Sequence, residues 1–324
     1  MKTIRWGMIG TGSVAEIKSG PALYKAAGSE LVAVMSPNAE RVKSFAHRHK
    51  VARWTTDADK LINDPEVEII YIATPPHLHM EYALRILEAG KMVYCEKPMA
   101  LSYEDCLTMI AKSKEKNIPL WVGYYRRALP RFKKIKEIVD SGQIGDVRSV
   151  RVNLYKHIVT DPENIAWRFM PEISGGGIFV DMGSHTLDFL DYVLGPINEA
   201  HGIAVNQLDD YPAEDNVSAV FRFANGAIGT GNWCFSTEHE LDQTELIGTK
   251  GSVAFASFSV RPIELTVNGE TSLIKIPDPE HVHQPLVETI LSEIGGTGIC
   301  PSSGVSAART NWVVDQILKN NSNA

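Results

Sequence analysis

The sequence predicts an α/β protein in two parts, a first half built on a parallel sheet and a second, α+β half with a large, mostly antiparallel open sheet. Two observations predict this. In the first 123 residues, short apolar runs alternate with helical patterns, which is typical of a parallel sheet with crossover helices. Beyond residue 123 the apolar runs have a period of two, and Asn225-Gly226 and Asn268-Gly269 favour tight hairpins between them. We therefore expect domains over residues 1–123 and 124–324.

The composition is that of an ordinary globular chain. The 324 residues are 44% hydrophobic and 22% charged, which suits about two domains. The formal net charge of −7 argues against nucleic acid as a partner, because no global basic field attracts a phosphodiester backbone. No apolar run approaches ~18 residues, so we expect no membrane span and a cytoplasmic protein. The four cysteines lack metal-ligand spacing, and no metal site is expected.

The first half reads as alternating strands and helices. Strands are expected at residues 4–9, 30–35, 67–73, 91–95 and 119–123. Helices are expected directly after the first strand and its glycine turn, and at residues 38–49, 79–89 and 103–116. The carboxyl ends of parallel strands meet at one edge of the sheet, where ligands of such folds bind.

The turn after the first strand reads Gly10-Thr11-Gly12-Ser13-Val14-Ala15, a G-x-G-x-x-A pattern between a strand and a helix. The first glycine permits a tight turn, the second lets a pyrophosphate approach the backbone, and Ala15 lets the helix pack closely on the strand. In this βαβ context the pattern predicts a Rossmann dinucleotide-binding domain.

The end of the second strand favours NADP over NAD, although NAD remains possible. An NAD site usually carries Asp or Glu there, and this chain has Met35-Ser36-Pro37 instead. Arg41, one turn into the next helix, could reach a 2'-phosphate. Ser36 also has a structural interpretation, as an N-cap followed by proline.

Two further strand ends supply candidate site residues. Thr74 and Pro75 are plausible walls of the cofactor site, and His79 either joins them or only decorates the start of its helix. The strand at 91–95 ends on Glu96-Lys97-Pro98, where Pro98 stiffens the backbone beside a lysine that Glu96 can orient. The alternative for this tripeptide is an exposed surface ion pair, which is common and weak.

The second half begins with a basic helix at 128–140, whose cations are most simply a solvated face. Strands are expected at residues 147–155, 197–207, 216–223, 227–234, 242–247 and 252–256. A closing helix at 306–319 could pack back on the first domain.

One glycine-rich helix entry in this half carries chemistry. Gly175-Gly176-Gly177 precedes Asp181 and His185, which are four residues apart and so share one helix face. That face carries an acid and the side chain best suited to proton transfer near neutral pH. A lone histidine on an amphipathic helix can also be structural.

Three motifs in this order resemble the family of glucose-fructose oxidoreductase and myo-inositol dehydrogenase, most closely its 1,5-anhydro-D-fructose reductase branch. They are Gly10-x-Gly12-x-x-Ala15, Glu96-Lys97-Pro98 and Gly175-Gly176-Gly177-x-x-x-Asp181-x-Gly183-x-His185. The resemblance covers essentially the whole chain. It implies a Rossmann domain followed by an open-sheet domain, a nicotinamide cofactor, and hydride chemistry on sugars, polyols or related carbonyls. It also implies a cis bond before Pro98 and a homo-oligomer, here a homodimer or homotetramer.

Carried onto this sequence, the resemblance implies that Lys97 bonds the reacting oxygen, His185 exchanges its proton and Asp181 positions substrate hydroxyls. Residues expected on the substrate side are Tyr124, Arg126, Trp167 and Arg168. Residues expected to bind the cofactor are Gly10, Thr11, Gly12, Ser13, Val14, Ala15, Ser36, Arg41, Thr74, Pro75, His79, Glu96 and Lys97. The stretch 123–126 departs from the reductase branch, which leaves the carbohydrate-like substrate open.

The leading hypothesis is therefore an NADP-preferring sugar or keto-sugar oxidoreductase. A second hypothesis is glycoside cleavage assisted by transient oxidation with NAD. A third is a catalytically silent nucleotide-binding regulator, which would be expected to lose titratable groups from the site. This chain retains Lys97, Asp181 and His185.

Overall fold

In the computed structural model, which describes residues 2–161 and 165–319, the chain divides into two compact units. Unit 1 comprises the chain up to Leu129 together with Pro279–Ala308, and unit 2 comprises Pro130–Asp278 together with the chain from Arg309 onward. Unit 1 is therefore formed by two stretches of the chain, and a single boundary at residue 123 cannot account for the second stretch, residues 279–308. Of the closing helix, α10 (Gly304–Leu318), only the part up to Ala308 belongs to unit 1.

Unit 1 is built on a six-stranded parallel sheet with the strand order β3-β2-β1-β4-β5-β6. This is the doubly wound order, in which the carboxyl ends of β1 and β4 lie side by side at the point where the order reverses. The expected parallel sheet is confirmed. Its strands are β1 (Ile4–Ile9), β2 (Ser29–Met35), β3 (Arg53–Thr55), β4 (Ile69–Ile72), β5 (Met92–Cys95) and β6 (Leu120–Val122).

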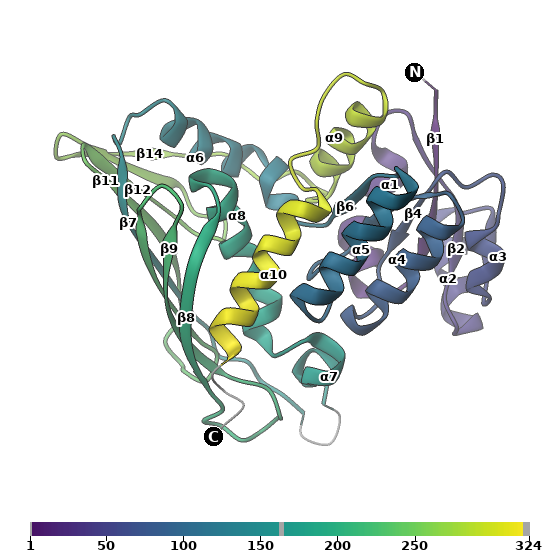
Figure 1. Ribbon diagram of the computed structural model, residues 1–324, viewed down its shortest axis with the longest axis horizontal. Coiled ribbons are helices and arrows are strands. Elements are labelled where there is room, and N and C mark those ends of the chain that lie inside the picture. Colours follow the sequence, from purple (N-terminus) through teal and green to yellow (C-terminus); the bar gives the residue numbers. More distant parts are fainter. Residues whose placement is uncertain (1, 162–164, 320–324) are drawn as a thin grey trace. The chain divides into compact units, whose positions relative to one another are not determined.

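The helices of unit 1 begin at capping residues that the sequence supplies. Asp57 and Ser102 each accept a main-chain N–H at the start of their helix. Helices α4 and α5 run side by side in Figure 1. The sequence did not lead us to expect α9, which follows the second sheet. The helices are α1 (Ala22–Lys25), α2 (Ala39–His49), α3 (Ala58–Ile62), α4 (His79–Glu88), α5 (Tyr103–Lys116) and α9 (Gln284–Ile294).

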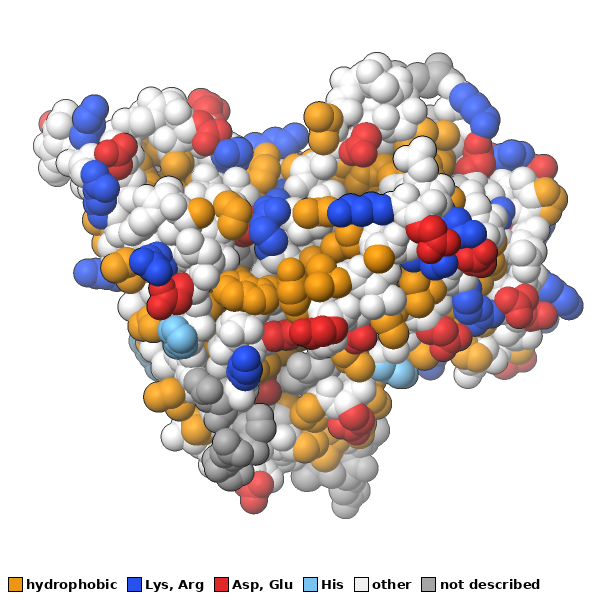
Figure 2. Space-filling view, in the orientation of Figure 1, with side chains coloured by type: hydrophobic (Ala, Val, Ile, Leu, Met, Phe, Trp, Pro, Cys, Tyr) orange, Lys and Arg blue, Asp and Glu red, His pale blue; other side chains and the backbone are white. Residues whose placement is uncertain are grey.

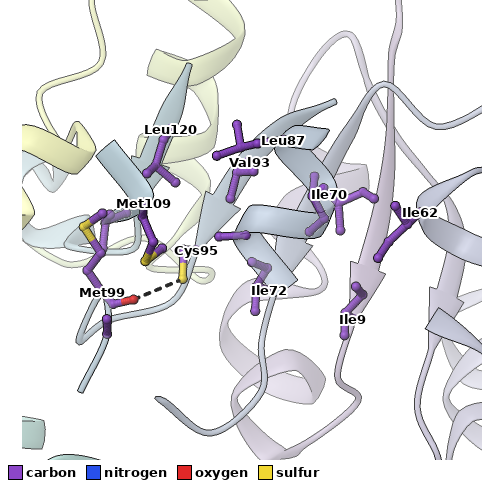
Figure 3. Packing of buried hydrophobic residues seen from close by; sticks show 14 of the residues in the cluster. Ile9, Ile62, Ile70, Ile72, Leu87, Val93, Cys95, Met99, Met109 and Leu120 are labelled. Atoms are coloured by element: carbon purple, nitrogen blue, oxygen red, sulfur yellow. Dashed lines mark hydrogen bonds between the residues drawn. The ribbon is translucent and has the colours of Figure 1, made fainter. Parts of the chain in front are cut away.

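The core of unit 1 packs strand residues against α3, α4 and α5. Ile70, Ile72 and Val93 are fully buried among side chains from these helices, as Figure 3 shows. Cys95 belongs to the same cluster, and its thiol donates to the Met99 carbonyl. Close packing of branched side chains fixes the strand ends from which the candidate site is built.

Unit 2 is built on an eight-stranded mixed sheet with the order β14-β13-β12-β11-β7-β10-β9-β8. Only the β7–β10 pair is parallel; the others are antiparallel. The large, mostly antiparallel sheet is thus confirmed, and Figure 1 shows it as a broad, twisted sheet. Its strands are β7 (Val147–Tyr155), β8 (Ile197–Val205), β9 (Asn216–Phe223), β10 (Ile228–Cys234), β11 (Leu241–Gly248), β12 (Gly251–Phe255), β13 (Ile263–Val267) and β14 (Glu270–Ile274).

One face of this sheet is buried and the other is exposed, because side chains along a strand such as β9 alternate between the two. On the buried side, Phe132 of α6 (Pro130–Asp140) meets Phe189 of α8 (Ser184–Leu194) and Phe255 of β12 edge to face. The short α7 (Pro171–Ser174) precedes the glycine-rich turn.

The surface shown in Figure 2 carries both basic and acidic side chains, as the mixed charges of the sequence lead one to expect. On the face shown in Figure 2, Lys and Arg side chains are interspersed with Asp and Glu. None of the helices among the described residues is both long enough and apolar enough to cross a membrane.

Candidate functional site

The turn after β1 is shaped by Gly10. Its φ of +102° lies in the left-handed region, and a Cβ on this residue would come within 2.5 Å of the Ala73 carbonyl oxygen. The Gly10 N–H donates to the Met35 carbonyl at 2.8 Å. Gly10 therefore lets the chain turn between the ends of β2 and β4, where a side chain would not fit.

Features beside this turn fit a bound dinucleotide. The hydroxyls of Thr11 and Thr74 are buried and, within residues 2–161 and 165–319, have no hydrogen-bond partner. A Cβ on Gly12 would meet nothing within 4 Å, so the backbone there is open to a ligand. Phosphate and ribose oxygens are the partners that such hydroxyls need.

The helix after the turn starts at Ser13 and Val14 and continues as a π-helical turn, Ala15–Ser19. Ala15 is fully buried, as its expected packing role requires. The Glu16 N–H donates to the Gly12 carbonyl at 3.0 Å, so the second glycine already belongs to the first helical turn. The expected helix is confirmed, but in an irregular form that is frequent at functional sites.

The end of β2 differs from the expectation in one detail. Asn38, and not Ser36, caps α2, because its Oδ1 accepts the Arg41 N–H at 2.9 Å. The N-cap interpretation of Ser36 is therefore wrong. Ser36 is buried directly after β2, while Arg41 has an exposed side chain with no ion-pair partner in the described part of the chain.

His79 holds two loops of the site edge together. Its ring is fully buried, with Nδ1 2.9 Å from the Pro98 carbonyl and Nε2 2.9 Å from the Thr74 carbonyl. Burial lowers the pKa of His79, which the carbonyls partly oppose. The predicted contact between His79 and the cofactor stays a prediction, since in this structure the two carbonyls occupy both ring nitrogens. Pro75, in contrast, is half-buried at the same edge.

β5 delivers Glu96 and Lys97 to the same edge, and the Lys97-Pro98 bond is cis, as the resemblance implies. Glu96 is buried; its Oε1 accepts the Tyr71 hydroxyl and its Oε2 accepts the Lys97 N–H at 3.1 Å. Burial raises the pKa of Glu96, opposed by the Tyr71 hydrogen bond and the Lys97 charge. A buried Glu96 rules out an exposed surface pair.

Tyr124 and Arg126, expected on the substrate side, are both largely buried in unit 1. Arg126 lies in the short helical turn Tyr125–Ala128, and its guanidinium is 5.1 Å from the centre of the Tyr125 ring. The cation is therefore held close to the protein interior rather than extended into solvent.

In unit 2, the glycine-rich turn packs against Glu214. The Gly177 N–H donates to Glu214 Oε1 at 2.7 Å, and a Cβ on Gly177 would come within 2.6 Å of the Glu214 carbonyl oxygen. Burial raises the pKa of Glu214 to about 7. This contact fixes the chain at the entry to the helix that carries Asp181 and His185.

Asp181 lies in a π-helical turn, Phe179–Gly183, that runs directly into α8. Its Oδ2 is 3.5 Å from Arg168 Nε, and the Arg168 guanidinium lies 4.3 Å from the centre of the Trp167 ring. Asp181 and the pair Trp167-Arg168, which were predicted from two separate stretches of the sequence, thus lie together in unit 2.

His185 follows in the first turn of α8, with 5% of its surface exposed. The Phe258 ring meets it nearly perpendicularly, with ring centres 6.1 Å apart. The loop that carries Phe258 is fixed by Asp242, whose carboxylate accepts the N–H groups of Ser257, Phe258 and Ser259 at 2.7–2.8 Å. His185 therefore faces a rigid aromatic wall.

Sequence reasoning missed three residues of this arrangement: Glu214, Phe258 and His283, which is described below. Each comes from a segment far along the chain from the motif it supports, so no local spacing connects them. Pro285, two residues after His283, marks a helix start and is a signal that could have located α9. Over the described ranges, no three His, Cys, Asp or Glu residues are grouped as a metal site requires.

Two family profiles match this chain. Residues 4–124 match the profile described as the oxidoreductase family with an NAD-binding Rossmann fold, and residues 132–254 match the GFO/IDH/MocA C-terminal domain. These regions correspond to the sheet of unit 1 and to most of the sheet of unit 2.

Relatives match over nearly the full length. Oxidoreductase P35 of Formosa agariphila is 38% identical over 316 residues, which cover 96% of this chain and 97% of that protein. The 1,5-anhydro-D-fructose reductase of Ensifer adhaerens is 28% identical over 306 residues, covering 93% and 91% of the two chains. A solved structure of levoglucosan dehydrogenase with NADH and levoglucosan shares the fold, with a TM-score of 0.87, 24% identity and coverage of 98% and 96%. This chain therefore belongs to the GFO/IDH/MocA family of oxidoreductases, with the NAD-binding Rossmann domain in unit 1.

Proposed function

We propose that this oxidoreductase transfers hydride between the nicotinamide of NADP and a carbinol or carbonyl carbon of a sugar, keto-sugar or polyol. The observation that carries the proposal is the retained set of reactive side chains, each with a fixed local geometry. Lys97 follows β5, and its main-chain N–H donates a hydrogen bond to the carboxylate of buried Glu96. His185 follows the π-helical turn that contains Asp181. The relative from Ensifer adhaerens, a 1,5-anhydro-D-fructose reductase, supports a sugar-like substrate.

The chemistry divides among these side chains. When bound, the nicotinamide supplies the carbon that gives or takes hydride. In the oxidative direction the substrate C–H bond breaks with its electron pair, the C–O bond becomes C=O, and the hydroxyl proton leaves. His185 takes this proton, while the Lys97 ammonium stabilises negative charge on the oxygen. Asp181, close to Arg168, orients neighbouring hydroxyls.

The preference for NADP rests on the residues after β2. No carboxylate stands there to repel a 2'-phosphate, and the Arg41 side chain is exposed on the first turn of α2. A guanidinium binds phosphate through charge-assisted hydrogen bonds. The levoglucosan dehydrogenase structure contains NADH, so relatives with this fold do not all require the phosphate.

We also propose a homodimer or homotetramer formed through the exposed face of the unit 2 sheet. Ile203 of β8, Val220 of β9 and Ile228 of β10 are 71%, 52% and 57% exposed on adjacent strands. Apolar side chains gathered on an exposed sheet face are typical of an interaction surface. A second copy of the same chain would cover this face by symmetry.

The experiment that tests the function is a substrate screen. Aldoses, ketoses and dicarbonyl sugars are incubated with NADPH or NADH, and the absorbance of the reduced nicotinamide is followed. We expect turnover with carbonyl sugars and lower KM for NADPH than for NADH. Consumption of neither cofactor with any of these sugars would contradict the proposal. Glycoside cleavage without net cofactor consumption would support the alternative chemistry instead.

A further inference from the structure

His283 lies beside Glu96 in unit 1, although all of the second sheet separates the two residues in the sequence. It immediately precedes α9, and its side chain is 1% exposed. The Tyr94 hydroxyl is 3.0 Å from its Nδ1, and its Nε2 is 3.5 Å from Glu96 Oε1. The Tyr125 ring packs on the imidazole with ring centres 4.5 Å apart. The imidazole is thus held by three aromatic and acidic neighbours.

These contacts select one tautomer of His283. Burial, together with the positive charges of Lys18, Lys97 and Arg126, lowers the pKa of His283 to about 3, so the ring is neutral and carries a single N–H. When the Tyr94 hydroxyl donates to Nδ1, that N–H is on Nε2 and points to the Glu96 carboxylate. The other tautomer would set a nitrogen lone pair against a carboxylate oxygen.

Glu96 therefore receives hydrogens from three directions. The Tyr71 hydroxyl and the Lys97 main-chain N–H donate to it, and the His283 N–H approaches the same oxygen as Tyr71. At 3.5 Å the last contact is mainly an attraction between a charge and a dipole, which is stronger in a buried site than in water. The charged or titratable groups that act on Glu96 and His283 are Lys18, Tyr71, His79, Tyr94, Lys97 and Arg126.

We infer that His283 is a positioning residue for the proposed hydride transfer: it keeps Glu96 an oriented carboxylate, and Glu96 holds the main chain at Lys97. This inference rests on the proposed role of Lys97. A charged Glu96 accepts the Lys97 N–H strongly. The segment 279–308, which returns to unit 1 after the second sheet, thus supplies a part of the site that residues 1–129 lack.

Two substitutions separate positioning from folding. Tyr94→Phe removes only the hydroxyl that selects the tautomer, and His283→Phe keeps a ring for Tyr125 and removes both nitrogens. In each we expect kcat to fall about tenfold and KM for NADPH to change less than about twofold. We also expect the acidic limb of kcat/KM to move up by about one pH unit, because Glu96 loses the His283 donor in one variant and the hydroxyl that fixes this donor's tautomer in the other, and so protonates at higher pH. His283→Gln, whose amide can accept from Tyr94 and donate to Glu96, should restore the limb.

The double variant Tyr94→Phe/His283→Phe leaves no buried hydroxyl without a partner, so its thermal unfolding should stay close to that of the wild type. If this stable variant keeps the wild-type acidic limb while Lys97→Ala is inactive, the inference is overturned and the proposed function stands. If Lys97→Ala retains normal turnover, the proposed function itself fails.

The chain offers a matched control in Tyr24, His49 and Glu16. The Tyr24 hydroxyl is 3.2 Å from His49 Nδ1, and His49 Nε2 is 3.1 Å from Glu16 Oε1, the same order of groups nearer the surface. Tyr24→Phe removes the corresponding hydroxyl without touching Glu96. We expect an unchanged kcat and acidic limb in this variant. A shift as large as that of Tyr94→Phe would overturn the special role of His283.

Discussion

Arg41 is the residue on which cofactor choice depends in our proposal. Charge-assisted hydrogen bonds contribute roughly 1.5–3 kcal/mol each, so Arg41→Ala should weaken NADP binding about tenfold or more and leave NAD binding nearly unchanged. Titration of both cofactors into the two proteins by calorimetry measures this. Lys43→Ala, which removes an exposed cation two residues away, is the control. Equal losses for NADP and NAD in Arg41→Ala would show that this side chain never meets the 2'-phosphate.

Lys97 and His185 should behave as one unit in catalysis. His185→Ala should lower kcat by about 10² to 10⁴ with little change in cofactor affinity, and Lys97→Ala should act similarly through lost charge stabilisation. Under the proposed function both groups act on the same substrate oxygen, and the effects of such groups are non-additive, so the double variant should cost far less than the product of the two single effects. Steady-state kinetics with the best sugar from the screen provides all three values. Near-normal turnover in both single variants would show that Lys97 and His185 have a structural role and not a catalytic one.

For single residues, the sequence located those whose position is set by the strand end beside them. It did not indicate which of these side chains are buried. Gly10 and Lys97 are placed by the strand ends that precede them, so the motif and the structure agree. His79 looks the same in the sequence whether it faces a ligand or the interior. Its actual position follows from the carbonyls of Thr74 and Pro98, and the second of these lies on another loop.

Among the elements, strands and helices with a strong local pattern were predicted to within about two residues. The strands over residues 147–155 and 216–223 have the expected bounds, and Asn268 and Gly269 both have positive φ, as the hairpin turn requires. α9 was missed, although Leu286, Val287 and Ile290 line its buried face. It packs against α1 and the helical turn Tyr125–Ala128, both of which are far along the chain from residue 284.

The contact between the glycine-rich turn and Glu214 should make stability depend on pH. The pKa of Glu214 is about 7 in the folded state and near 4.5 without burial, so the folded chain keeps this proton to a higher pH than the unfolded chain does. Its contribution to stability therefore falls as pH rises from about 4.5 to 7, by up to about 3 kcal/mol. Glu214→Gln keeps an acceptor for the Gly177 N–H and does not titrate.

We expect Glu214→Gln to match the wild type at pH 5 and to be about 2 kcal/mol more stable at pH 8, measured by urea unfolding at both values. Glu172→Gln, which changes an exposed acid just before the same turn, should leave the pH dependence as it is. Parallel stability curves for wild type and Glu214→Gln would contradict the assignment.

For the whole molecule, the exposed sheet face predicts self-association. Val220→Asp places a charge in the middle of the apolar residues on β8, β9 and β10, and burying it against a second copy would be costly. We expect this variant to have the mass of a monomer by light scattering at micromolar concentration, where the wild type is a dimer or tetramer. Leu107→Asp, an exposed position on α5, should keep the wild-type mass. A wild-type chain that is monomeric would remove the proposed interface.

The division into two parts could be predicted from the change in hydrophobic period near residue 123. The return of residues 279–308 to unit 1 could not be predicted in this way. Segment 279–308 contributes to the edge of its sheet: the Val122 N–H donates to the Ser302 carbonyl at 3.1 Å, and the Ser302 hydroxyl donates to the Val122 carbonyl at 2.7 Å. Trp121 and Ser303 form an isolated bridge beside them. A serine-rich stretch carries no local signal that it will cover a strand.

The covered edge of β6 has a consequence for how the chain is made. About 150 residues lie between Leu129 and Pro279. At ribosomal speeds of roughly 5–20 residues per second, the first unit waits on the order of 10–30 s for the strand that covers its edge. During that interval the N–H of Val122 lacks its Ser302 acceptor, and an open edge of this kind is a template for wrong pairing between nascent chains. We therefore expect wrong pairing of the chain to be most frequent during translation, before residues 279–308 are made.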